Sequence, residues 1–219
     1  MARLAEKAAA EFVGTALLVC VVVGSGIMGA NLSTDLGVVL IVNALSTIFA
    51  LALLIVVLGP ISGAHFNPVV SLVQLFTGQQ PFAETIVFIV SQVAGATAGA
   101  IVANVMFDLP ALQFSTHDRL SPGMLLGEVL ATAGLIALIG VLVHRGQEQF
   151  ISVAVAAWIG SAYFFTSSTS FANPAVTVGR LFTDTFAGIA PGSVLPYIGA
   201  QVVGAAIGVA IIAALKRAE

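Results

Sequence analysis

Charge, cysteine and basic clusters are all scarce in this chain, and each scarcity excludes a class of protein. Only 8% of the 219 residues are charged, whereas about a quarter of a soluble domain is charged. The single cysteine, Cys20, excludes an internal disulfide and a cysteine-based metal site, and we expect no metal or cofactor. No basic cluster suggests a nucleic-acid partner. The rest is strongly apolar, with a mean hydropathy of +1.10 that excludes a water-soluble globule.

Six long apolar runs dominate the sequence, and each approaches the ~20 residues that a helix needs to cross ~30 Å of hydrocarbon. None of the runs alternates apolar and polar residues, which excludes a membrane β-barrel. We therefore predict an all-α membrane protein with six transmembrane helices, at residues 8–29, 36–58, 86–107, 125–143, 151–170 and 194–215.

Positively charged residues gather on one side of such a six-span chain. That side holds both termini and the connection between the fourth and fifth runs, and its basic residues are Arg3, Lys7, Arg145, Lys216 and Arg217. The long loop 108–121 on the other side has Arg119 alone. Because short cytoplasmic loops carry an excess of Lys and Arg, we expect both termini to be cytoplasmic.

The second half of the chain repeats the first in three matched blocks. AEFVGTALLV matches GEVLATAGLI, NPVVSLVQLFT matches NPAVTVGRLFT, and QVAGATAGA matches QVVGAAIGV, in the same order. Each half contains three spans, an odd number, so the halves must lie in the membrane with opposite orientation. We predict a single domain over residues 1–219, built as an inverted 3+3 repeat of 8–107 and 125–215.

Two segments that begin with Asn-Pro are too short to cross the membrane. Residues 67–76 and 173–182 would each cover ~15 Å as a helix, about half of the hydrocarbon core. Asn is a favoured N-cap and Pro a favoured first helical residue. The stretches before them, GPISGAHF and TSSTSF, are irregular, and such backbone persists at membrane depth only where it is buried or lines a wet cavity. We predict two half-membrane helices whose N-termini meet near the midplane.

Two facing helix N-termini create an electropositive centre, which opposes cations and protons in a narrow water-filled path. The carboxamides of Asn67 and Asn173 would add hydrogen-bond donors at that centre. A passing water or hydroxyl would accept from the Asn pair and donate outward, which interrupts a continuous proton wire. The pattern therefore favours passage of neutral solutes.

The segments SGAHFNPVV and FANPAV resemble the paired Asn-Pro-Ala boxes of the major intrinsic protein family, the aquaporins and glycerol facilitators. The similarity covers essentially the whole chain, with a Glu in the first span and a Gln in the third span of each half. It implies an aquaporin-like fold and a passive channel for small neutral solutes, not an enzyme, in the bacterial inner (plasma) membrane and as a homotetramer. The residues that match the boxes are Asn67, Pro68, Val69, Asn173, Pro174 and Ala175.

The selectivity filter departs from the family pattern. In most members an Arg follows the second box at once, and here that place holds Val176, which removes five donors and a fixed charge. Counting as in the family places the other filter residues at Thr47, at Gly160 or Ser161, and at Ser170, with no bulky aromatic or His among them. We expect a wider, more apolar filter.

Such a filter moves the expected solutes from water alone toward glycerol-sized polyols. The family includes a bacterial subgroup with an altered filter that is linked to neutral metalloids such as arsenite and methylated arsenicals, and this specialisation is a further possibility here. Arg180 lies one helical turn beyond Val176 and either reaches back to replace the missing charge or pairs with Asp184 at the rim. We favour the pair.

Three further titratable residues lie in or beside the predicted spans. Glu11 and Glu128 occupy matching places, and either form a proton relay or accept backbone N–H groups and hold the loops, as the resemblance implies; we favour the second. His65 precedes the first box and is either a pore-side group or pH gate, or packs within its loop, which we favour.

Two other classes of protein compete with the channel. Secondary active transporters also use inverted repeats and broken helices. Against them, the sequence has no further ionisable cluster at the midplane besides the two Glu residues. An intramembrane enzyme would need a nucleophile, a base and an orienting group, and Ser62 and His65 lack the third.

Overall fold

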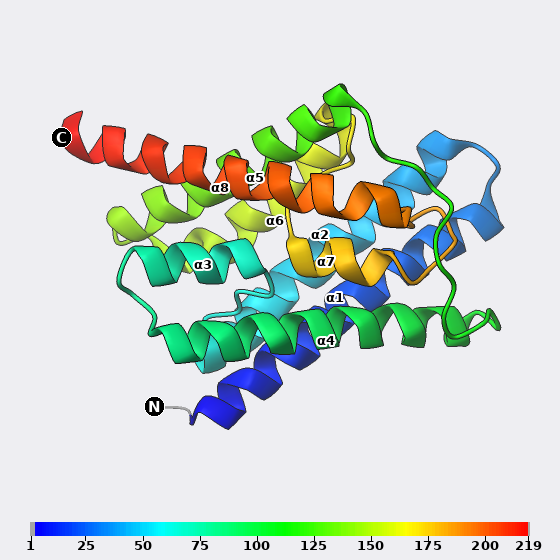
Figure 1. Cartoon of the computed structure of the whole chain (residues 1–219), viewed down its shortest axis with the longest axis horizontal. Helices are drawn as coiled ribbons and strands as arrows, with labels where there is room; N and C mark the ends of the chain where they lie inside the picture. The colour runs from blue at the N-terminus through cyan, green and yellow to red at the C-terminus, as the bar shows by residue number, and fades with distance from the viewer. Residues whose placement is uncertain (1–2, 219) are drawn as a thin grey trace.

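Six long helices form a bundle with both chain ends at the same end of the molecule (Figure 1). The computed structural model describes residues 3–218. The six are long and apolar enough to cross a membrane. They are α1 (Leu4–Leu32), α2 (Leu36–Ser62), α4 (Phe82–Met106), α5 (Pro122–His144), α6 (Ile151–Phe165), which a short 3-10 helix η1 (Glu148–Phe150) precedes, and α8 (Pro191–Ala218).

Two half-length helices lie between the long ones, where the Asn-Pro segments predict them. They are α3 (Pro68–Phe76) and α7 (Pro174–Arg180). The Oδ1 atom of Asn67 accepts a hydrogen bond from the N–H of Val69 at 3.1 Å, and Oδ1 of Asn173 accepts from Ala175 at 2.9 Å. Each Asn is therefore an N-cap, with Pro following at the first helical position.

The fifth long helix ends earlier than the sequence predicts. It stops at Phe165, and the residues up to Ser170 form an irregular loop rather than a last turn and a half of helix. Thr169 and Ser170 adopt positive φ values of 61° and 51°, which a right-handed helix excludes. The predicted span 151–170 is wrong by five residues for this reason, and α7 likewise ends two residues before the predicted Phe182.

Close helix pairs form the core of each half. The first helix packs on α4, and α5 packs on α8. A Cβ atom at Gly95 or Gly99 of α4 would strike the carbonyl oxygen of Phe12 or Ala16. The matching glycines of α8, Gly204 and Gly208, would strike Val129 and Ala133 in the same way, at 2.5 and 2.7 Å. Glycine at these matched places lets the paired backbones touch.

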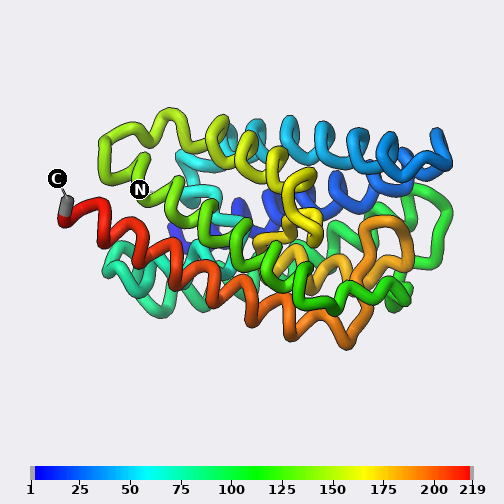
Figure 2. Tube along the Cα trace, turned by 90° about the horizontal axis from the view of Figure 1, so that it is seen from above, coloured from blue at the N-terminus to red at the C-terminus, as the bar shows by residue number. Residues whose placement is uncertain are grey.

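The half-helices contact both of these pairs, α3 through α4 and α8, and α7 through α1, α4 and α8. Figure 2 shows α2 and the start of α6 along one side of the bundle, and α8 with α3 along the other. The short helices α3 and α7 also contact each other, as the prediction of N-termini that meet requires. The arrangement is the aquaporin-like inverted repeat that the sequence indicates.

Candidate functional site

The two Asn side chains hold each other's loops where the half-helices meet. Nδ2 of Asn67 donates to the carbonyl oxygen of Ala172 at 2.8 Å, and Nδ2 of Asn173 donates to the carbonyl oxygen of Phe66 at 2.7 Å. Each carboxamide thus uses its oxygen as the helix cap and one N–H on the opposite loop. One N–H of each side chain remains, and both Asn residues line the same cavity.

The loops that receive these bonds carry the same strained backbone. Ala64 and Phe66 have φ values of 49°, and their counterparts Ser170 and Ala172 have 51° and 48°. Non-glycine residues with positive φ are uncommon and cost about 1–3 kcal/mol each. The backbone with positive φ directs the carbonyls of Phe66 and Ala172 toward the Asn residues of the other half.

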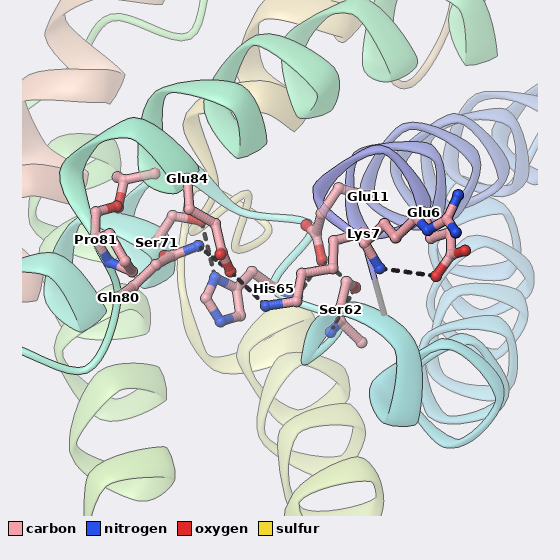
Figure 3. A network of polar contacts seen from close by, with 12 residues as sticks. Glu6, Lys7, Glu11, Ser62, His65, Ser71, Gln80, Pro81 and Glu84 are labelled. Atoms are coloured by element: carbon pink, nitrogen blue, oxygen red, sulfur yellow. Dashed lines mark hydrogen bonds and ion pairs between the residues drawn. The ribbon is translucent and has the colours of Figure 1, made fainter. Parts of the chain in front are cut away.

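Buried carboxylates hold these loops in place. Glu11 accepts hydrogen bonds from the backbone N–H groups of His65 at 3.0 Å and Phe66 at 2.7 Å, and from Ser62 Oγ at 2.6 Å (Figure 3). Glu128 accepts from Phe171 at 2.9 Å and Ala172 at 2.8 Å. Both Glu residues are fully buried. These contacts agree with the hypothesis that each Glu holds its loop through backbone N–H groups, rather than with a proton relay.

A Gln on the third span of each half connects the carboxylate to the half-helix. Nε2 of Gln92 lies 2.8 Å from Glu11 and 3.0 Å from Ser71 Oγ. Nε2 of Gln201 lies 2.6 Å from Glu128 and 2.9 Å from Thr177 Oγ1. Because charged hydrogen bonds are about twice as strong as neutral ones, this carboxylate network fixes the Asn loops firmly.

One cavity runs past the Asn pair, and its volume is about 220 Å³. Toward the termini it is lined by Gln74, Val143 and Ile151, and near its middle by the two Asn residues. Beyond them, the lining residues toward the opposite end are Thr47, Tyr163, Ser170, Phe171, Val176 and Arg180. We call this last group the constriction residues.

The structure corrects the predicted filter residue on the fifth long helix. Gly160 faces α2, where an added Cβ would strike Ile48, and Ser161 is exposed on the outer surface. Neither lines the cavity, and Tyr163 of the same helix does. The expectation of no bulky aromatic is therefore wrong, because the counted register was two to three residues short of the inward-facing position.

The hydroxyl groups of Thr47 and Tyr163 lie 3.2 Å apart, where α2 and α6 contact each other. Thr47 Oγ1 already donates to the backbone carbonyl of Asn43 at 2.8 Å, and a carbonyl can only accept. Tyr163 must therefore donate to Thr47. The Tyr163 oxygen is left with only its lone pairs to offer to the cavity.

Arg180 is buried and lines the cavity, so the favoured pair with Asp184 is wrong. Asp184 is exposed and accepts from the N–H and the hydroxyl of Thr116, at 2.8 and 3.0 Å, which lowers its pKa. Arg180 is 2% exposed, and its Nε donates to the carbonyl of Ala187. Its guanidinium lies over the ring of Phe171, 3.4 Å from the centroid. A cation therefore occupies the constriction despite Val176.

The connection between α4 and α5 supports this side of the site. Backbone N–H groups of Gln113 and Ser115 donate to Phe182 and Leu181, just after α7. Arg119 donates to the carbonyls of Gly188 at 2.7 Å and Phe186 at 3.0 Å, and burial lowers its pKa.

His65 lies on the cavity wall, on the termini side of the Asn pair. Its Nδ1 is 3.0 Å from Ser71 Oγ, and its ring meets Phe88 edge-on with centroids 5.2 Å apart. It thus packs within its loop, as favoured from the sequence, and also lines the cavity.

The remaining predicted residues lie beside the cavity. Pro68, Val69, Pro174 and Ala175 are buried in the first turns of the half-helices, and Val69 packs against Ile136 and Ala205 rather than lining the path. Sequence reasoning missed Tyr163 and Phe171. The repeat offers a signal for Phe171, because this residue occupies the same place before its Asn-Pro box as His65 does in the first half.

Comparison with known proteins gives one consistent relationship. A model of the major intrinsic protein family matches residues 2–172. The chain is 44% identical over 210 residues to aquaglyceroporin AqpS of Rhizobium meliloti, covering 95% of this chain and 89% of that one. It is 32% identical over 198 residues to Aquaporin Z of Brucella melitensis, covering 83% and 86% of the two chains. The aquaglyceroporin structure from Plasmodium falciparum shares the fold, with a TM-score of 0.72, 20% identity and coverage of 96% and 94%.

Proposed function

Because the chain belongs to the major intrinsic protein family, we propose that the cavity past Asn67 and Asn173 is the conduit of a passive channel for small neutral solutes. The family consists of channels. This favours a channel over both a secondary active transporter and an enzyme. The observation that carries the proposal is the reciprocal bonding of the two Asn side chains, which leaves one N–H of each for a solute in the cavity.

The Asn pair sets the direction of hydrogen bonds at the middle of the conduit. A water or hydroxyl oxygen at this level accepts from both free N–H groups and donates its hydrogens away from them. Neighbouring waters on the two sides are then oriented oppositely, which breaks a proton wire. The helix N-termini of α3 and α7 add partial positive charge that opposes cations.

The constriction residues choose the solute by offering donors and acceptors from different walls. Arg180 presents N–H donors, and the Tyr163 oxygen presents lone pairs. Val176 and the Phe171 ring supply apolar surface. A polyol has hydroxyl groups along one edge and carbon along the other, so glycerol-sized polyols fit this lining. Water and neutral metalloids, such as arsenite or methylated arsenicals, are further candidate solutes.

Stopped-flow measurements on proteoliposomes test the assignment. We expect water, glycerol and arsenite to enter faster than in protein-free liposomes, with rates that do not depend on a proton or sodium gradient. Water flux alone would contradict a glycerol-sized conduit. Uptake that requires an ion gradient would instead favour a transporter.

Substitution of Arg180 by Ala tests its place in the constriction. Loss of the guanidinium removes the cavity's fixed cation and leaves Val176 and Phe171 to dominate this level. We expect the ratio of glycerol to water permeability to change by about tenfold to a hundredfold, the effect of one hydrogen bond to a charged group. An unchanged solute profile would show that Arg180 has only a structural role.

The cellular setting is also proposed from these relationships. Bacterial relatives and the excess of Lys and Arg on the side of the termini support an inner-membrane location with both termini in the cytoplasm. The loop 108–121 and Arg180 would then face outward. The family resemblance supports a homotetramer with one conduit per subunit, which light scattering of the purified protein would test.

A further inference from the structure

Arg180 carries a buried charge that no carboxylate neutralises directly. Its Nε is bound by the Ala187 carbonyl, and neither terminal nitrogen has a hydrogen-bond partner within residues 3–218. The face of the Phe171 ring at 3.4 Å provides a cation–π contact, which compensates only part of the lost hydration. A buried guanidinium normally has a hydrogen-bonded anion beside it, because an unpaired buried charge is expensive.

A second cation lies on the same aromatic ring. The guanidinium carbon of Arg119 is 5.2 Å from the centroid of Phe171, and its Nε and Nη2 atoms donate to the backbone carbonyls of Gly188 and Phe186. Arg119 does not line the cavity, so it acts on this place only through its field. The two guanidiniums together make the end of the cavity beyond Val176 strongly electropositive.

The carboxylates near this end do not balance the two cations. Glu128 is buried, but its oxygens are occupied by Phe171, Ala172 and Gln201. Asp118 and Asp184 are solvent-exposed and bound to Ser193 and Thr116, where water and salt screen them. Two guanidiniums therefore face one buried carboxylate.

From this imbalance we propose an anion site at Arg180, where a small monovalent oxoanion with an apolar end binds and blocks the conduit. The planar guanidinium matches two oxygens of a carboxylate or sulfonate, and Val176 and Phe171 accommodate the apolar end. Further passage is opposed because the isopropyl group of Val176 offers no replacement for the anion's hydration. The proposal rests on the assignment of this cavity as the conduit.

Methanesulfonate and methanesulfonamide form a matched pair of probes. They have similar size and shape, but only the first is ionised at neutral pH. In proteoliposomes with either probe on both sides, we expect methanesulfonate to slow glycerol flux in a saturable way and methanesulfonamide to leave it unchanged. Saturation-transfer NMR on the methyl group should detect binding of methanesulfonate alone.

Two variants locate the site. In Arg180→Ala, the remaining glycerol flux should be insensitive to methanesulfonate. In Arg119→Gln, which keeps side-chain donors for the loop carbonyls, glycerol flux should stay normal while the half-blocking concentration rises about tenfold, because a nearby unit charge is lost. Arg119→Lys keeps the charge and should retain the block, which separates the effect of charge from that of loop packing.

The outcomes separate this proposal from the channel assignment. Normal glycerol flux that methanesulfonate does not slow would overturn the anion site alone. Equal slowing by both probes, or a block that persists in Arg180→Ala, would also overturn it. Absence of glycerol flux without any probe would instead count against the proposed conduit.

Discussion

Single side chains in this conduit have their hydrogen-bond roles fixed by neighbours outside it. Thr47 donates to the Asn43 carbonyl, so Tyr163 has to donate to Thr47 and can only accept from a solute. The Asn residues are fixed in the same way, because cap and loop bonds consume all but one N–H of each. The donors and acceptors that these side chains offer to a solute therefore depend on bonds that the solute never touches.

Substitution of Tyr163 by Phe tests the acceptor role. The change removes one oxygen from the constriction and keeps the ring, so glycerol loses an acceptor worth about 0.5–1.5 kcal/mol, which is roughly a twofold to tenfold lower permeability. Stopped-flow glycerol uptake measures it.

Ser161→Ala provides the control, because it removes a hydroxyl from the exposed face of the same helix. Its glycerol uptake should equal that of the wild type. A larger effect at Ser161 than at Tyr163 would restore the register that the structure corrects.

Glu128→Gln tests the loop-holding carboxylate. The amide has one acceptor oxygen, and its NH₂ group would face backbone donors that now point to a carboxylate. Each lost charged hydrogen bond costs about 1.5–3 kcal/mol, so we expect a lower melting temperature in detergent together with reduced glycerol flux. The exposed Glu148→Gln is the comparison, and equal melting temperatures for the two variants would refute the role.

At the scale of elements, the strained loops and the half-helices form one unit in each half. A carboxylate on the first span, a Gln on the third and a hydroxyl on the half-helix meet at Glu11, Gln92 and Ser71, and again at Glu128, Gln201 and Thr177. The network offsets the cost of positive φ at the residues before each Asn. It is possible only because the first and third spans lie in direct contact.

Gly208→Ala tests that contact between α5 and α8. The new Cβ would lie 2.7 Å from the Ala133 carbonyl oxygen, so the helices must separate at a cost of about 1–3 kcal/mol. Gly199→Ala on the same helix meets no atom within 4 Å and should raise helix stability by about 0.5–1 kcal/mol. In thermal unfolding measured in detergent, only Gly208→Ala should have a lower melting temperature than the wild type.

For the whole molecule, the position of the two cations gives the conduit a polarity along its length. Arg180 ends α7 and Arg119 lies in the α4–α5 connection, both at the end opposite the termini (Figure 1), whereas the Lys7–Glu84 ion pair at 2.9 Å joins the starts of α1 and α4. A solute therefore meets different electrostatics from the two sides. Orientation in the membrane decides which side of the cell meets the arginines.

Cysteine labelling on intact cells tests the orientation. In a Cys20→Ser background, Ala111→Cys and Gln147→Cys place a thiol at exposed positions in the connections that follow α4 and α5, which lie at opposite ends of the bundle (Figure 1). With cytoplasmic termini, a membrane-impermeant maleimide should label the first and spare the second until the cells are opened. The reverse pattern would overturn the predicted orientation.

Periodic and repeated features of the sequence determined the spans, the inverted halves, the half-helices and the Asn pair. These depend on composition, span length and capping chemistry, which are local. The tertiary structure decided that Tyr163 rather than Gly160 or Ser161 faces the cavity, because the rotation of α6 depends on its packing against α2. It also decided that Arg180 points inward, since the Ala187 carbonyl and the Phe171 ring hold it away from Asp184.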